Sequence, residues 1–456
     1  MSNPCFISVL GTNDYLPCNY YHSHDPEHRV EGVRFVQEAI ARLMDETTRN
    51  RLTTTIFVTK EAYTKNWLDN GHNNRQTGET LAREGLATCL RRLGLQPEAK
   101  NIPVGESEKE IWEIFQTITT SIPENASLIV DITHSFRSLS MVLLAAIQYL
   151  KTVKDVNVTA IHYGALEALG QLHDVRKLDI AQRNVPIFDL TPFDAILDWS
   201  HAVRNFRESG NAAPLVRLAQ RPVGAKLAET RGESMEARSL RDFINSLRDW
   251  NQCLTVNRAP EVREASATVS TALERVKEQA IAKESVLLPP LMPLLEQIQT
   301  EVAAFQGDHL DIALQTARWC LAHSFIPQGY TALQEGLVSW CMQQAGEEDI
   351  MDKDARTAAS AAFNIFNQKI IREKWNKDAR KHEKLVTTLH YLAGFKELAK
   401  LFNRLSTYRN NINHGGYNSD PLTADKLHQN LNQLINDISK WKTMYAADIS
   451  REKQLP

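Results

Sequence analysis

The chain has 456 residues, with 52 Lys or Arg against 55 Asp or Glu, a net charge of −3 and a pI near 6.5. This length predicts two or three domains with substantial cores. The balanced charge excludes bulk attraction to a long duplex, so any nucleic-acid contact must come from a local patch or a short substrate.

The spacing of cysteines and the length of apolar runs indicate the cellular compartment in which the protein is expected. The 6 cysteines include no Cys-x-x-Cys pair, which argues against a zinc ribbon or a disulfide framework. The amino terminus has no basic region of the kind that opens a secretory signal. The longest apolar runs, such as residues 139–150, are too short to span a bilayer. We therefore expect a soluble cytoplasmic protein with no membrane partner.

The first part of the chain alternates two kinds of segment. Short β-branched runs occupy residues 5–10, 54–59, 127–132 and 156–163, and helical spacing occupies residues 30–44, 78–93 and 106–119. This alternation predicts an α/β domain with a mostly parallel sheet and helices on both faces, which we place at residues 1–206.

Beyond about Trp199 the strand pattern disappears. Residues 210–214 are typical of a junction, and the prolines of residues 289–293 are expected to break the helical pattern once more. Apolar residues recur at helical spacing in two stripes, so residues 207–456 are predicted to be all-α. The first stripe is Tyr330, Leu333, Leu337, Val338 and Cys341, and the second is Leu398, Leu401, Phe402, Leu405, Tyr408 and Ile412.

Residues 128–138 form the most informative segment. An apolar run ends in Asp131, crosses a polar turn and enters a second apolar run, which predicts strand, loop and helix. Ligands bind beyond the carboxyl ends of strands in such sheets, and a helix N-terminus favours anions. The candidate ligand-binding residues are those of this turn together with the small or polar residues that follow two other strands: Thr133, His134, Ser135, Phe136 and Arg137, with Gly11, Thr12, Asn13 and Gly164. Alternatively, the polar turn only caps the helix.

The second candidate site lies at the end of the second apolar stripe, which runs from Leu398 to Ile412. Arg409, Asn410 and His414 precede Gly415-Gly416, a helix stop signal that places His414 in the last turn. Histidine can move protons near neutral pH, and an Arg fork suits phosphate oxygens, so the group fits phosphodiester cleavage. Residues five apart lie roughly 140° apart around a helix, so Arg409 and His414 converge only if the helix breaks or two copies combine across a twofold axis. The alternative is a capped surface helix.

Three similar patterns have simpler explanations. Arg318 and His323 share the same spacing inside an apolar stretch, which favours a structural role. Residues 369–384 are rich in Lys and Arg and carry Trp375, as an RNA-binding strip or a solvated helix face would. The histidine-rich residues 22–28 resemble a run of metallo-β-lactamase-fold nucleases, but the Asp comes one residue early, so we predict a polar loop and no metal site.

The front segments at residues 6–12, 131–137 and 162–167 resemble those of the CARF-domain CRISPR-associated proteins of type III systems (Csx-type accessory proteins). Ser135 stands where many relatives have Gly. In the back half, Arg409-Asn410-x-x-x-His414 resembles the signature of HEPN ribonucleases. The resemblance covers about the first two hundred residues well, and it covers the helical part mainly at that signature.

The resemblance implies a Rossmann-like CARF domain that binds a cyclic oligoadenylate, such as cyclic tetra- or hexa-adenylate, and a HEPN domain that cleaves single-stranded RNA without a metal or other cofactor. It further implies catalysis by Arg409 and His414, orientation by Asn410, and a homodimer or a higher oligomer. Two alternatives stay open. The chain could be a non-enzymatic sensor of the same ligand, or its front domain could itself degrade the activator.

Overall fold

The structure is a computed structural model that describes residues 4–74, 77–134, 137–282, 288–417 and 420–452. Its contacts divide the chain into two compact units, residues 1–195 and 196–456. The division falls inside helix α8 (Thr191–Ser209), and so does the boundary that the sequence placed after residue 206. Each unit has its own hydrophobic clusters.

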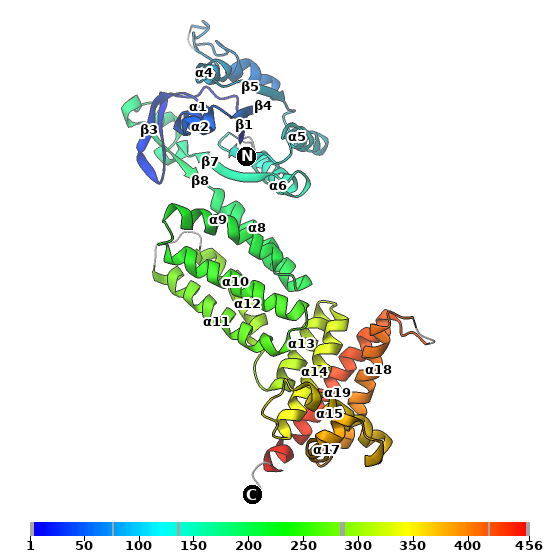
Figure 1. Cartoon of the computed structure of the whole chain (residues 1–456). Helices are drawn as coiled ribbons and strands as arrows, with labels where there is room; N and C mark the ends of the chain where they lie inside the picture. The colour runs from blue at the N-terminus through cyan, green and yellow to red at the C-terminus, as the bar shows by residue number, and fades with distance from the viewer. Residues whose placement is uncertain (1–3, 75–76, 135–136, 283–287, 418–419, 453–456) are drawn as a thin grey trace. The chain divides into compact units, whose positions relative to one another are not determined.

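The first unit is built on one mixed sheet of eight strands (Figure 1). Five neighbouring strands are parallel, which confirms the predicted parallel sheet, and an antiparallel strand and a hairpin extend it at one side. In spatial order the strands are β3 (Asp25–Val33), β2 (Cys18–His22), β8 (Asn184–Asp189), β7 (Asn157–Gly164), β6 (Ser127–Asp131), β1 (Pro4–Leu10), β4 (Thr53–Val58) and β5 (Pro97–Asn101).

Helices cover both faces of this sheet, as predicted. Side chains alternate between the faces along β1, so that Phe6 packs with one apolar cluster and Ile7 with the other. The first cluster includes α1 (Val36–Leu43) and α4 (Leu86–Arg92), and the second includes α5 (Glu108–Ser121) and α6 (Arg137–Val153). Short helical segments complete the unit: α2 (Glu46–Arg49), α3 (Lys60–Ala62), the π-helix η1 (Tyr63–Trp67), η2 (Leu166–Leu169), α7 (Leu172–Val175) and η3 (Ile180–Gln182).

Two predicted helices are partly wrong. Residues 30–33 belong to strand β3, and α1 begins only at Val36. The helix expected over residues 78–93 begins at Leu86, because the preceding residues form an extended segment with turns. Strand β3 lies at the edge of the sheet and is almost entirely exposed, so its polar residues carry no alternating apolar pattern.

The second unit is all-helical in the part that is described, as predicted. Its helices after α8 are α9 (Ala213–Glu229), α10 (Met235–Thr255), α11 (Ala259–Ala282), α12 (Leu288–Ala303), α13 (His309–Ala322), α14 (Ile326–Gln344), α15 (Lys353–Gln368), η4 (Arg372–Lys374), α16 (Lys377–Lys381), α17 (Glu383–His390), α18 (Phe395–Asn413) and α19 (Ala424–Glu452). Within the described ranges, no helix is long and apolar enough to cross a membrane.

The expected proline break is wrong in part. Helix α12 begins at Leu288 and carries Pro293 inside it. The other two prolines of residues 289–293 lie in its first turn, where a missing N–H removes no helical hydrogen bond. Pro293 removes one such bond without ending the helix. Residues 210–214 do form a junction, because α8 ends at Ser209 and α9 begins at Ala213.

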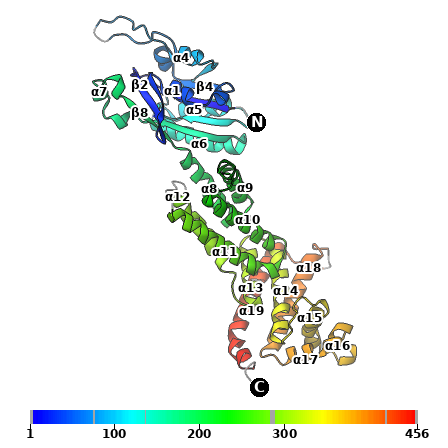
Figure 2. The same cartoon turned by 60° about the vertical axis from the view of Figure 1, so that its left-hand side comes forward.

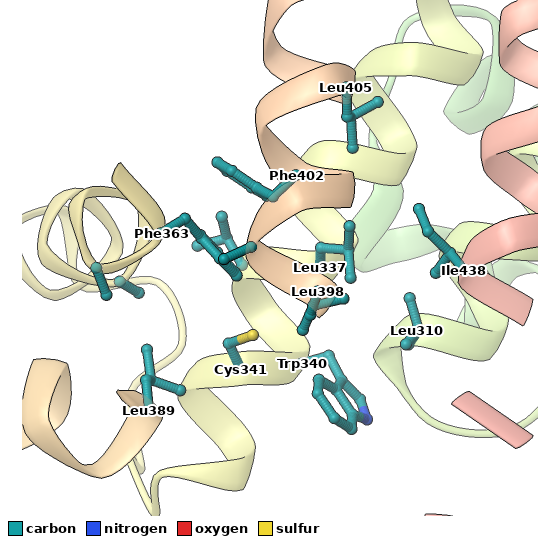
Figure 3. Packing of buried hydrophobic residues seen from close by; sticks show 14 of the residues in the cluster. Leu310, Leu337, Trp340, Cys341, Phe363, Leu389, Leu398, Phe402, Leu405 and Ile438 are labelled. Carbon is teal, nitrogen blue, oxygen red and sulfur yellow. The ribbon is translucent and has the colours of Figure 1, made fainter. Parts of the chain in front are cut away.

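Both predicted apolar stripes are confirmed as parts of one core. Helices α14, α15, α18 and α19 lie together in the second unit (Figure 2) and enclose this core. Leu337 and Cys341 of α14 and Leu398 and Phe402 of α18 are buried in it, as Figure 3 shows. The ring of Phe402 stacks on that of Phe363 with centroids 4.0 Å apart. This packing fixes which side of α18 faces inward.

Candidate functional site

The structure brings the predicted ligand residues of the first unit to one edge of the sheet. Strands β7, β6 and β1 are parallel neighbours, so the loops after them meet at their carboxyl ends. A Cβ added to Gly11 would lie 3.6 Å from Cβ of His134. The backbone N–H of Gly164 donates to Oγ1 of Thr133 at 2.8 Å. Ser135, Phe136 and the side chain of Arg137 lie outside the described residues.

Asp131 fixes the geometry of this edge. Its buried carboxylate accepts hydrogen bonds from Oγ of Ser8, at 2.7 Å, and from both the backbone N–H and the hydroxyl of Thr133. Burial raises the pKa of Asp131, while the bonds from Thr133 and Ser8 oppose that shift. Because Thr133 in turn accepts from Gly164, one carboxylate positions the ends of three strands.

His134 provides a ring rather than a charge. Burial lowers the pKa of His134 to about 4, so its imidazole is neutral at neutral pH. The ring stacks on that of Tyr15, with centroids 4.3 Å apart. A Cβ at Gly11 would meet the Tyr15 hydroxyl at 2.4 Å, so a larger residue there would displace the Tyr15 ring. The edge therefore holds a stacked aromatic pair next to the Gly11 loop, with the Tyr15 ring itself buried.

Asn66 also belongs to this edge, although no pattern in the sequence points to it. It lies fully buried in the π-helix η1, and its amide donates to the carbonyl oxygens of both Gly11 and Asn13, each at 2.9 Å. Its own carbonyl oxygen accepts from Arg34 at 3.2 Å and lies 3.0 Å from Nε2 of His72. One amide thus holds the loop that contains Thr12, and π-helical turns of this kind often occur at functional sites.

We expect Asn66→Ala to lower the free energy of unfolding by about 1–2 kcal/mol, because two partly buried hydrogen bonds to the Gly11 and Asn13 carbonyl groups would be lost. Thermal and urea unfolding of the full chain measure the change. Asn101→Ala, at an exposed position on β5, is the matched control and should change stability by less than about 0.5 kcal/mol. Equal stability of both variants would contradict the assigned role of Asn66.

The histidine-rich hairpin does not form a metal site among the residues that the structure describes. The ring of His22, at the end of β2, lies 5.3 Å from that of His24 and 5.4 Å from that of His162 on β7. Burial lowers the pKa of His22 and brings that of His162 to about 4. The His22 ring packs against the other two, and burial disfavours a charge on His22 and His162.

In the second unit, the predicted catalytic residues lie on different sides of α18. The helix ends where expected: His414 is its C-cap, its N–H donates to the carbonyl of Asn410 at 3.1 Å, and Gly415 and Gly416 follow with φ of 59° and 80°. Asn410 and His414 are exposed on one side. Arg409 is half-buried and faces helices α14 and α15. One copy of the chain therefore does not bring Arg409 and His414 together.

Arg409 instead belongs to a charged group that sequence reasoning missed. Its Nη2 lies 3.9 Å from Oε1 of Glu335 on α14, and the other oxygen of Glu335 accepts from Arg356 on α15 at 2.7 Å. Arg356 also donates to the Ser339 hydroxyl and the Ile350 carbonyl, both at 2.8 Å. In the sequence, Glu335 stands beside the apolar stripe of α14, as solvent-exposed residues of many helices do. Its contacts with Arg356 and Arg409 could therefore be found only from the fold.

The two weaker sequence patterns are largely used in structural contacts. Arg318 donates to the Ser439 hydroxyl at 2.6 Å, and His323 packs against the buried Trp319. Both contacts support the structural role predicted for this pair. Within residues 369–384, Arg372 pairs with Glu383 and Lys381 with Asp354 of α15.

The fold and these contacts define an α/β unit with a loop-lined sheet edge, followed by an all-helical unit with an Arg-Asn-x-x-x-His helix end. No protein-family model matches the chain. The chain is similar to the CRISPR-associated protein MJ1674 of Methanocaldococcus jannaschii, with 21% identity over 243 residues. The match covers 53% of this chain and spans only 33% of that protein. This similarity supports a relationship to CRISPR-associated proteins.

Proposed function

We propose that the chain is an RNA endonuclease of CRISPR antiviral defence that a cyclic oligoadenylate switches on. The observation that carries the chemistry is the end of α18, where His414 and Asn410 are exposed side by side while Arg409 extends toward a polar pocket. The similarity to a CRISPR-associated protein supports the setting. The meeting of the loops that follow the parallel strands β1, β6 and β7 at one sheet edge supports a ligand site there.

In the proposed reaction, His414 removes the proton of a ribose 2′-OH, and the 2′-oxygen attacks the adjacent phosphorus. The bond to the 5′-oxygen of the next nucleotide breaks, and that oxygen takes up a proton. The products are a 2′,3′-cyclic phosphate and a 5′-hydroxyl end. Arg409 stabilises the negative charge that builds up on the phosphate oxygens, and Asn410 orients the attacking ribose. No step uses a metal.

We infer that two copies combine, because Arg409 and His414 diverge around α18 as long as that helix stays unbroken. In a twofold dimer, each site would combine Arg409 of one copy with His414 of the other. Activation then requires that the cyclic oligoadenylate bind the active dimer more tightly than the inactive one. Equal affinity for both would leave the equilibrium between them unchanged.

The test is cleavage of a labelled single-stranded RNA by the full chain, with and without cyclic tetra- or hexa-adenylate, in buffer with and without a chelator. We expect cleavage that depends on the activator and is insensitive to the chelator. Loss of cleavage on chelation would contradict the mechanism. Binding of the activator without cleavage of any RNA would instead favour a non-enzymatic sensor, and slow loss of the activator itself would reveal degradation by the first unit.

A further inference from the structure

A polar pocket opens beside Arg409, within the second unit. It has a volume of about 710 Å³ and lies between α14, α15 and α18. That volume lies within the range of small-molecule sites, which are about 300–1,000 Å³. Four of its lining residues are charged, three of them cationic (Lys353, Arg356 and Arg409) and one anionic (Glu335). The pocket therefore favours an anion.

Not all of these charges are available to a ligand. Arg356 is held by Glu335, Ser339 and the Ile350 carbonyl, so it forms a wall of the pocket. Arg409 differs, because its Nε is buried with no hydrogen-bond partner in the described chain and its only ion pair given by the structure, to Glu335, is long at 3.9 Å. Lys353 is exposed at the start of α15. Arg409 and Lys353 are thus the cations that face an incoming anion.

Three amide side chains also line the pocket, those of Gln334, Asn364 and Asn376. The carbonyl oxygen of Gln334 is buried without a hydrogen-bond partner in the part of the chain that is described. Asn364 lies on α15, is exposed and lines the same pocket. A buried polar group without a partner costs free energy unless a ligand or water satisfies it. An amide offers a donor and an acceptor side by side, the pattern that reads the edge of a nucleic-acid base.

We propose that this pocket binds the nucleotide next to the scissile phosphate of the RNA and sets the sequence preference of cleavage. Arg409 and Lys353 bind the phosphate groups of the RNA backbone at the pocket. Gln334 and Asn364 contact the edge of the base inside it. This proposal rests on the proposed RNA cleavage. It also explains why Arg409 faces away from His414: it joins the pocket to the reacting phosphate.

The test measures binding of short RNAs by the full chain carrying His414→Ala, so that nothing is cleaved. Fluorescence anisotropy is recorded for oligonucleotides of A, C or U over a range of salt concentrations. Lys353→Ala should weaken binding to all sequences alike. It should also reduce the slope of the logarithm of the binding constant against the logarithm of salt concentration by about one. Asn364→Ala and Gln334→Ala should reduce the preference between sequences roughly tenfold.

Lys440→Ala, an exposed lysine on α19, is the matched control for charge. Binding unchanged by Lys353→Ala and Asn364→Ala would overturn the proposal, and so would an equal effect of Lys440→Ala. Asn364 is exposed, so its variant keeps the test valid if Gln334→Ala unfolds.

Cleavage mapping separates this proposal from the proposed function. In the otherwise unchanged chain, Asn364→Ala should change the distribution of cut sites along the RNA. If the chain cleaves RNA at unaltered positions, the pocket proposal fails alone. If the chain binds RNA with the expected variant effects and yet never cleaves it, the pocket proposal stands and the ribonuclease proposal fails.

Discussion

His414→Ala should lower the rate of RNA cleavage about a thousandfold at saturating activator, since a positioned proton-transfer group contributes typically about 10²–10⁴-fold. The side chain is exposed at the C-cap of α18, and the bond of that residue to the Asn410 carbonyl uses its backbone N–H. The variant should therefore fold and bind the activator as the parent does. Single-turnover cleavage of a labelled RNA measures the rate, and thermal unfolding checks the fold.

His428→Ala is the matched control, because His428 is an exposed histidine on α19 of the same unit. It should cleave RNA at the parental rate. Cleavage by His414→Ala at that same rate would exclude the proposed chemistry. A loss of cleavage accompanied by a lower unfolding temperature would show that His414 stabilises the helix end instead.

Strands β1, β4, β6 and β7 could be predicted. The edge strands β3 and β5 could not, and neither could β2 and β8, which lie between β3 and β7. Strand β6 is buried on both faces and is therefore an uninterrupted apolar run, whereas β3 is exposed along most of its length and β5 is polar. Hydrophobic periodicity reports burial, so it is silent where a strand has little to bury. For the same reason the stripes of α14 and α18 were found and the polar segment before α4 was not.

The candidate sites show a similar limit. Gly11, Thr133 and Gly164 could be grouped from sequence because parallel strands end at one edge of a sheet. Asn66 could not, because it reaches the Gly11 loop from a π-helical turn without a pattern of its own. Likewise, Arg409 was selected by its motif, but Glu335 and Arg356 come from separate helices. Residues brought together by tertiary packing leave no local signal.

A mixed dimer should recover the activity that each catalytic variant loses. Arg409→Ala and His414→Ala chains are co-expressed with different tags, and dimers that carry both tags are isolated. If each site combines Arg409 of one copy with His414 of the other, one of the two sites in this dimer is complete. It should then cleave RNA at about half the parental rate, hundreds of times faster than either variant alone.

The pairing of a parental chain with an Arg409→Ala/His414→Ala double variant decides how the site is built. Sites shared between copies would leave this dimer inactive, because each site would lack one of the two residues. Sites contained within one chain would leave it at about half the parental rate. That second result, together with an inactive mixture of the single variants, would contradict the shared site and require α18 to change shape near its end, since Arg409 and His414 now lie on different sides of the helix.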